Sequence, residues 1–229
     1  MEEEVLEEME NETQIPDLKL SKMTNTYTNQ GQESMNTMIY RYDIQNRLVE
    51  VESTTPNLVT TAIYHYKNDQ IVLLESSHGG IRNYMYENGR VIESNWIRET
   101  ITLKYVYEYD NFGYLSKKTE YIDGDVNCVL EFNNDISGNT ILSIDPCNEI
   151  TSTLEYDTKP NVYLRIGLTN GFKKINRIGL NNYTRTTKEY TTGTIITDFV
   201  YTYNSDNYPS QTKLYQEGNL VSTYDFFYE

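Results

Sequence analysis

Residues 107–115 read YEYDNFGYL, and this stretch decides the fold class. Two tyrosines two residues apart lie on the same face of a β-strand, because side chains alternate between faces along an extended chain. The DNFG segment at 110–113 contains residues that accept positive φ, as tight turns require. Leu115 then begins a second apolar run. The stretch therefore predicts an antiparallel hairpin in which the acid after Tyr-x-Tyr begins the turn.

This pattern recurs about every 23 residues along the chain. Each unit has an alternating strand that ends in an aromatic pair, a polar turn and a second strand. The second aromatic residues of the units are Tyr42, Tyr66, Tyr86, Tyr109, Phe132, Tyr156 and Tyr203. The first aromatic is replaced in Leu130-Glu131-Phe132 and Leu154-Glu155-Tyr156, which leaves the repeat number open.

The residue between the two aromatics is mostly polar, so one face of the predicted sheet is aromatic and the other faces water. These intervening residues are Arg41, His65, Met85, Glu108, Glu131, Glu155 and Thr202. Eight units predict an all-β, antiparallel up-and-down meander of about sixteen short strands. A sheet of that size would leave edges exposed, so we expect a closed or nearly closed barrel, with a strongly bent open meander as the alternative.

The predicted barrel is soluble, because its wet face carries charges. A basic residue turned toward lipid at the bilayer midplane costs about 2–4 kcal/mol. The chain also lacks the run of about 18 apolar residues that a membrane helix needs. We therefore expect a protein that is lipid-anchored at most and does not span the membrane.

The chain divides into an acidic tether at 1–18 and a single β-repeat domain at 19–229. Residues 157–185 interrupt the repeat with six bases and one acid, and their apolar spacing mixes alternation with that of a short helical turn. We interpret this segment as an irregular crossover packed on the sheet or across one mouth of the barrel. Its positive charge would complement the acidic remainder.

The formal net charge of −15 is concentrated at the N-terminus. Residues 1–17 contain eight acids and no Lys or Arg, which leaves 26 acids against 19 bases, a net charge of −7, for the rest. Such a run repels itself, which favours a solvated tether. Nothing basic enough to gather phosphate backbones is present, so a nucleic-acid partner is not expected.

Cys128 and Cys147 are the two cysteines of the chain. Two cysteines alone make no metal site, and they can simply be two small apolar residues. If they lie near opposite ends of one hairpin, a disulfide is geometrically possible in an exported protein. The sequence leaves both interpretations open.

Candidate chemistry is sparse. His65 falls between two tyrosines on the wet face, and His78 lies in a glycine turn, so both are expected to be solvated rather than catalytic. The acids at 123–127 (DGDVN) lack the central glycine and distal glutamate of an EF-hand and favour a hairpin turn over a calcium site. Trp96 is expected in the core rather than as an exposed sugar platform. No catalytic residue, metal site, ligand-binding residue or cofactor is predicted.

The repeated YxYD, polar turn and RLxxV pattern resembles the tyrosine–aspartate (YD) repeats of the RHS type. Together with YDTKPNVY (156–163), GLNNYTR (179–185) and YTYNSDNYPSQ (201–211), it more closely resembles exported Bacteroidetes lipoproteins, a family of unknown function (DUF4595-like) with a porin-like fold. This resemblance covers roughly residues 20–229. It implies a barrel-like meander, an outer-membrane lipoprotein facing the periplasm or the cell surface, and a signal segment that this chain lacks. It provides no functional residues.

The leading hypothesis is a noncatalytic cell-surface or periplasmic module that binds a glycan, a peptide or a partner protein. One alternative is a hydrolase with a cryptic site at the barrel mouth, because catalytic groups can assemble from distant positions. Another is a shell that encloses a second polypeptide, as in the RHS repeats. Converging acids or histidines at one mouth would favour the enzyme, whereas a groove lined with aromatic residues would favour binding.

Overall fold

The computed structural model describes residues 18–29, 32–98, 101–168 and 170–229. The acidic tether expected at 1–18 lies, except for Leu18, outside the described residues. Among the described residues the structure is almost entirely β, with one 3₁₀ turn and one short α-helix between two strands. No helix in the described ranges has the length and apolar character needed to cross a bilayer.

Sixteen strands follow one another along the chain. Their bounds are β1 (Leu20–Asn29), β2 (Gln32–Tyr42), β3 (Leu48–Thr55), β4 (Leu58–Lys67), β5 (Gln70–Ser76), β6 (Gly80–Glu87), β7 (Arg90–Arg98), β8 (Ile101–Tyr109), β9 (Leu115–Ile122), β10 (Asp125–Asn134), β11 (Thr140–Asp145), β12 (Ile150–Pro160), β13 (Asn181–Tyr190), β14 (Gly193–Tyr203), β15 (Pro209–Gln216) and β16 (Asn219–Tyr228).

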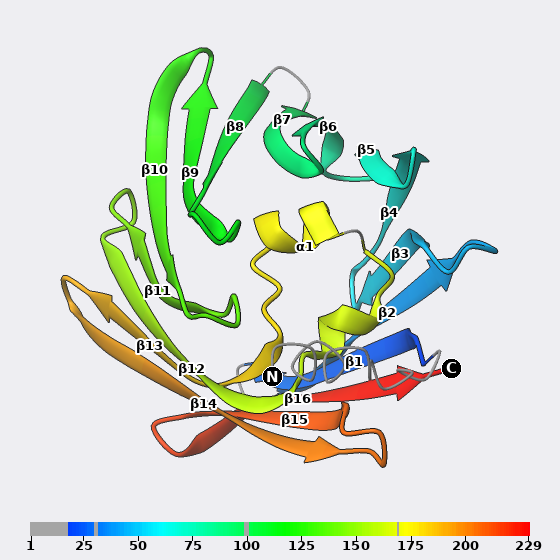
Figure 1. Cartoon of the computed structure of the whole chain (residues 1–229). Helices are drawn as coiled ribbons and strands as arrows, with labels where there is room; N and C mark the ends of the chain where they lie inside the picture. Colours follow the sequence, from blue (N-terminus) through cyan, green and yellow to red (C-terminus); the bar gives the residue numbers. More distant parts are fainter. Residues whose placement is uncertain (1–17, 30–31, 99–100, 169) are drawn as a thin grey trace, which may run out of the picture.

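The strands form a closed antiparallel barrel, with each strand paired to its neighbours in sequence (Figure 1). Closure comes from β1 and β16, where Met23 lies opposite Phe226 and Tyr27 lies opposite Ser222. The prediction of an all-β, sixteen-stranded antiparallel meander is therefore confirmed, and the sheet is closed rather than bent and open. Closure leaves no strand edge free to pair with another chain.

The paired aromatics face the inside of the barrel, as the alternation predicted. Tyr40, Tyr84 and Tyr107, the first aromatics of their pairs, are buried at about 6% exposure each. The outer face instead carries cross-strand ion pairs, such as Lys104 with Glu93 at 2.6 Å. Similar pairs join Arg41 to Glu50 and Glu52, Lys117 to Glu108, and Arg185 to Asp198.

The acid after Tyr-x-Tyr begins the turn, as expected. The Oδ1 atom of Asp110 accepts hydrogen bonds from the backbone N–H groups of Phe112 and Tyr114, both at 2.9 Å. Gly113 takes a φ of 81°, which a side chain would disfavour. The same arrangement recurs after Asp43, Asp135 and Asn204.

Hydrogen bonds from the second aromatic residues link each hairpin to the preceding one. Six hydroxyls donate, at 2.6–2.8 Å, to carbonyls at or near the first residue of an odd-numbered strand: Tyr42 to Leu20, Tyr66 to Leu48, Tyr86 to Ile71, Tyr109 to Val91, Tyr156 to Thr140 and Tyr228 to Pro209. Asn134 Nδ2 makes the equivalent bond to Leu115 O at 2.9 Å. Tyr203 completes the set by donating to the carboxylate of Asp157. We call these eight interactions the inter-hairpin hydrogen bonds.

The segment between β12 and β13 forms a plug, defined here as residues 161–168 and 170–180, which lies within the barrel of strands (Figure 1). It contains a 3₁₀ turn, η2 (Val162–Arg165), and a helix, α1 (Asn170–Ile175). The alternating Val162 and Leu164 would suit a strand, but the Asn161 side chain caps a helical turn by accepting from Tyr163 N at 2.9 Å. The irregular segment is thus shorter than 157–185, because β12 and β13 extend into that range.

The plug fills the aromatic interior of the barrel. Phe172 of α1 makes edge-to-face contacts with Tyr84 and Tyr64, with ring centroids 5.2 and 6.0 Å apart. Val162, Ile166 and Leu168 join the same buried cluster. The plug therefore fills the interior beside Tyr64 and Tyr84. Two pockets lie between the plug and the strands that surround it.

Candidate functional site

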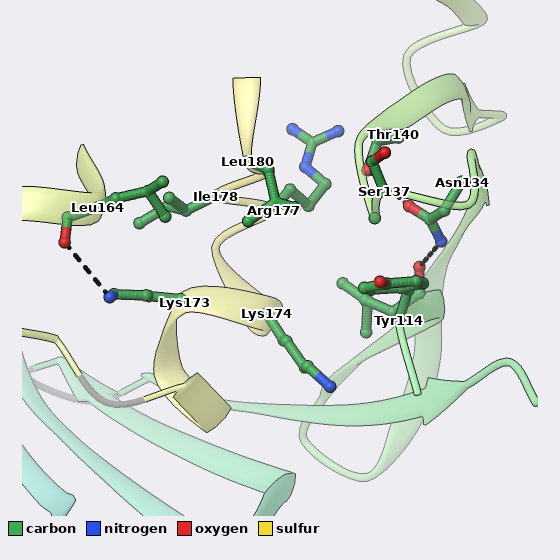
Figure 2. Close-up of a pocket in the computed structure, with 13 residues that line it drawn as sticks. Tyr114, Asn134, Ser137, Thr140, Leu164, Lys173, Lys174, Arg177, Ile178 and Leu180 are labelled. Carbon is green, nitrogen blue, oxygen red and sulfur yellow. Dashed lines mark hydrogen bonds between the residues drawn. The ribbon is translucent and has the colours of Figure 1, made fainter. Parts of the chain in front are cut away.

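The first candidate site is a basic pocket at the end of the barrel that carries the turns between β8 and β9 and between β10 and β11. We call it the mouth pocket; it has a volume of about 220 Å³. The plug supplies one side, and Figure 2 shows Lys174 and Arg177 extending from it toward the wall that carries Tyr114, Ser137 and Thr140. Lys173 extends the other way and donates to Leu164 O at 3.4 Å.

Arg90, Lys173, Lys174 and Arg177 gather at this mouth. A methyl group added at Gly113 would lie 2.6 Å from Arg90 Nη2 and 3.3 Å from Lys174 Nζ, so these two cations meet at the same turn. Within the described ranges none of the four forms an ion pair with a carboxylate. The expected complementarity between the plug and the acidic remainder therefore does not take the form of direct pairing.

Burial and repulsion by neighbouring arginines destabilise the charged forms of the two lysines. Burial, with a smaller effect of Arg165, lowers the pKa of Lys173 below its ordinary value. Burial and then Arg90 lower the pKa of Lys174, while Asp110 acts weakly in the opposite direction. An anion in the pocket would relieve both effects, because it supplies the opposite charge that these groups lack.

Aromatic rings line the same region and hold the cations in place. Lys174 Nζ lies 5.5 Å from the ring centre of Tyr114, and the guanidinium of Arg177 lies 5.0 Å from that of Phe132. Such cation–π contacts orient the charged groups without neutralising them. Positive charge beside flat aromatic and apolar surface suits a ligand that combines anionic groups with rings.

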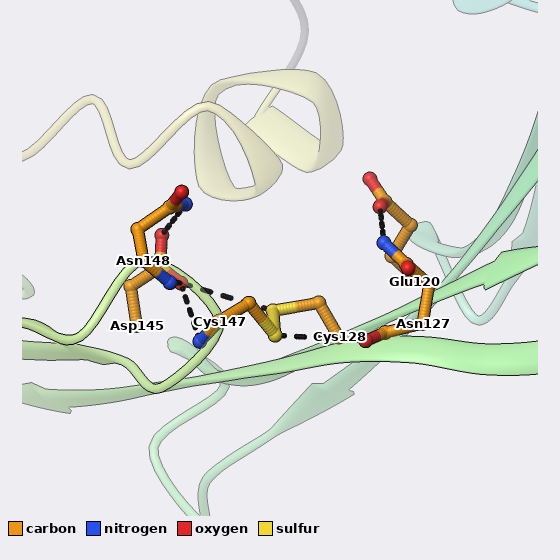
Figure 3. The surroundings of a disulfide bond; sticks show 6 residues. All are labelled: Glu120, Asn127, Cys128, Asp145, Cys147 and Asn148. Carbon is orange, nitrogen blue, oxygen red and sulfur yellow. Dashed lines mark hydrogen bonds between the residues drawn. A yellow bond between two sulfur atoms is a disulfide. The ribbon is translucent and has the colours of Figure 1, made fainter.

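The structure joins Cys128 of β10 to Cys147, in the turn between β11 and β12, by a disulfide (Figure 3). Their Cα atoms are 5.9 Å apart, a usual separation for a bridged pair. Asp145 shapes the turn by accepting from the backbone N–H groups of Cys147 and Asn148 at 3.2 and 3.1 Å. The two sulfurs and an oxygen of Asp145 lie within 4.8 Å of one another, so after reduction the two thiols and this carboxylate would offer three metal ligands.

The remaining sequence candidates do not assemble into a catalytic group. His65 faces outward, with Nε2 at 3.6 Å from Glu75 Oε2 on the charged outer surface. His78 is exposed, and its Nδ1 lies 3.1 Å from Ser77 Oγ without an acid to orient it in the described residues. In the 123–127 stretch, residues 123 and 124 form the turn between β9 and β10, and residues 125–127 begin β10. Trp96 packs against the core and donates its indole N–H to Gly79 O.

Sequence reasoning missed the mouth pocket, although it noted the bases that line it. The six bases at 157–185 were visible as a cluster, but nothing in their spacing placed three of them, Lys173, Lys174 and Arg177, at the mouth pocket. The quoted KPN and NN blocks also meet in space. Asn182 Oδ1 accepts from Val162 N at 3.3 Å, and Asn182 Nδ2 donates to Pro160 O at 2.9 Å. These bonds fix the plug where it leaves the wall.

The fold and the pocket together define a class: a closed sixteen-stranded antiparallel barrel with an internal plug and a basic mouth. No protein-family model matches the chain, and no curated protein matches its sequence. Among solved structures, the chain is similar to a porin-like protein from Bacteroides uniformis, with a TM-score of 0.66, 15% identity, and coverage of 92% of this chain and 98% of the other.

A porin-like protein from Bacteroides vulgatus is also similar, with a TM-score of 0.58, 13% identity and coverage of 92% and 98%. At these identities the likeness establishes the fold alone, and it agrees with the expectation of a porin-like barrel. A weaker match is the Tc holotoxin pore of Photorhabdus luminescens, with a TM-score of 0.33, 11% identity and coverage of 85% of this chain and 13% of that one. A score this low carries no argument for an RHS-type shell.

Proposed function

We propose that this chain is a noncatalytic, exported binding barrel that recognises an acidic glycan at the mouth pocket. The observation that carries the proposal is the set of four cations at one mouth with no carboxylate partner among the described residues. Sugar carboxylates or sulfates would supply the missing charge, and the Tyr114 ring would pack against a sugar face.

Three features support an exported protein that stays in water. The outer face carries several ion pairs, which are favourable in contact with water and costly in contact with lipid. A disulfide between Cys128 and Cys147 is stable in an oxidising compartment. The fold is similar to that of porin-like Bacteroides proteins. These features support our proposal of a surface or periplasmic lipoprotein that is held by a lipid anchor at most.

Isothermal titration calorimetry with a pentagalacturonate and the neutral maltopentaose tests the proposal. We expect saturable binding of the acidic sugar only, weakening as salt rises because the pairing is partly exposed. The double substitution Lys174→Gln and Arg177→Gln should weaken binding at least about tenfold, which corresponds to about 1.4 kcal/mol. The matched control Lys67→Gln with Lys213→Gln removes the same charge from outside the pocket and should change affinity less than about twofold.

Equal binding of the neutral sugar, or equal losses in the two double variants, would contradict a specific site at the mouth. Preferential binding of hexaglutamate would replace the glycan with an acidic peptide. Turnover of the sugar during the titration would favour the hydrolase alternative over a binding module.

A further inference from the structure

A second pocket lies between the plug and the inner face of the strands β13 to β16. We call it the aromatic box; it has a volume of about 220 Å³. Tyr163, at the start of the plug, covers one side. The wall contributes Tyr183, Phe199, Tyr201, Leu214, Tyr224 and Phe226, together with Thr212. None of the residues that line the box is charged, so it differs chemically from the mouth pocket.

The register of the strands creates the space. Thr212 on β15 lies directly between Tyr201 on β14 and Tyr224 on β16, so a small side chain separates two large rings on the inner face. Leu214, two residues further along β15, lies opposite Phe199 and forms the next row of the floor. A ring-sized gap therefore exists above Thr212, with aromatic walls on both sides.

The surroundings of the box disfavour charge. Burial, with smaller effects of Tyr224 and Tyr183, raises the pKa of Tyr163 to about 12. Burial also raises the pKa of Tyr201 above its ordinary value. Charged phenolates are disfavoured there, and a charged ligand would be disfavoured for the same reason.

Thr212 supplies the second, independent observation. It is only 3% exposed, it lines the box, and its Oγ1 has no hydrogen-bond partner in the part of the chain that the structure describes. The barrel satisfies a comparable group elsewhere, because Ser94, which is fully buried opposite Tyr84, has its hydroxyl 2.9 Å from the hydroxyl of Tyr107. Buried hydroxyls without a partner are rare and call for an explanation.

We propose that the aromatic box is a binding site for a small, uncharged aromatic molecule with one hydroxyl group, a simple phenol. The ring would pack between Tyr201 and Tyr224. The Thr212 Oγ1 is itself enclosed, so a rotation about χ1 of Thr212 would exchange its methyl and hydroxyl groups and turn Oγ1 toward the ligand hydroxyl. The volume is sufficient, since an apolar cavity of about 150 Å³ can hold benzene. This site is independent of the glycan proposal, because the two pockets share no lining residue.

Fluorine NMR titration of the full chain with 4-fluorophenol and 4-fluorotoluene tests this assignment, since the probes differ mainly in the hydroxyl. We expect both to bind saturably and the phenol to bind about tenfold more tightly, the effect of one buried hydrogen bond. Thr212→Val keeps the shape of the side chain but removes its hydroxyl. In this variant the two probes should bind with about equal affinity, and 4-fluorotoluene should bind at least as well as it does to the wild type.

Thr119→Val, a buried threonine of similar exposure far from the box, is the matched control and should keep the tenfold preference. Thermal unfolding of each variant verifies that it folds. No saturable binding of either probe would overturn the assignment and leave an adventitious water as the partner of Thr212. An unchanged preference in Thr212→Val would also overturn it. The mouth variant Lys174→Gln with Arg177→Gln should bind the phenol as the wild type does, which separates this test from that of the glycan.

Discussion

Replacing Tyr66 with phenylalanine tests one of the eight inter-hairpin hydrogen bonds. The hydroxyl of Tyr66 donates to Leu48 O at 2.7 Å, and Leu48 is only 1% exposed, so the carbonyl would lose its phenol donor in a place that water hardly reaches. Leaving a buried acceptor unsatisfied costs about 1–3 kcal/mol. For a chain of this length that cost lowers the melting temperature by about 3–9 °C. The stacking of Arg47 on the ring, at 4.6 Å, is retained by phenylalanine.

Tyr64→Phe is a closely matched control. Tyr64 lies two residues earlier on the same strand and the same inner face, but its hydroxyl makes no hydrogen bond among the described residues. We expect its removal to change the unfolding free energy by less than about 0.5 kcal/mol. Guanidinium unfolding at equilibrium measures both variants. If Tyr66→Phe is no less stable than Tyr64→Phe, the inter-hairpin hydrogen bonds do not hold neighbouring hairpins together and the reasoning is wrong.

Three further predictions concern the disulfide, the buried phenols and the N-terminus. Reduction, or substitution of Cys128 and Cys147 by serine, should lower the unfolding free energy by about 3 kcal/mol, the usual effect of opening a loop of this size; two thiols titrated without reductant, or tight zinc binding, would contradict the bridge. The unfolding free energy should decrease above about pH 10, where tyrosines of the unfolded chain ionise. Burial raises the pKa of interior tyrosines such as Tyr40 and Tyr84, so each contributes stability that is complete below pH 10 and is lost toward its folded pKa, at about 1.4 kcal/mol per pH unit; equal stability at pH 8 and pH 11 would disprove this. Deleting residues 1–17 changes the net charge from −15 to −7 and should speed association of an acidic glycan at low salt, measured by stopped flow, with the gain lost in 0.5 M salt; an equal gain at both salt concentrations would show that charge is not the cause.

The strands, the inward face and the turns could be predicted because each follows from local pattern. The alternation around Tyr107 and Tyr109 fixes which face is buried, and Asp110 announces the turn through side-chain hydrogen bonds to its own neighbours. The number of units favoured closure but left a strongly bent open meander as the alternative, because closure depends on the pairing of β1 with β16, which are distant in sequence. The face of the sheet that is exposed to solvent could also be predicted, because its charged residues occupy every second position.

The plug and both pockets could not be predicted, because they depend on contacts between distant residues. Nothing near Thr212 indicates that it lies between Tyr201 and Tyr224, since that depends on the register of three strands. The bases of the plug were noticed, but whether they lie over the mouth, on the sheet or inside the barrel depends on how the plug packs. Seven of the eight acceptors of the inter-hairpin hydrogen bonds are backbone carbonyls and the eighth is the carboxylate of Asp157, and sequence reasoning could not assign them.

Nitration of the folded protein by tetranitromethane, followed by peptide mapping, tests the central claim that the phenols of successive hairpins share one enclosed interior. Tyr40, Tyr84 and Tyr107 should remain unmodified until the chain is unfolded, because each is about 5–6% exposed. Tyr121 and Tyr215, which lie on the outer face, should react in the native state. Native reaction of the first three at the rate of the outer two would contradict the barrel and both of its proposed sites.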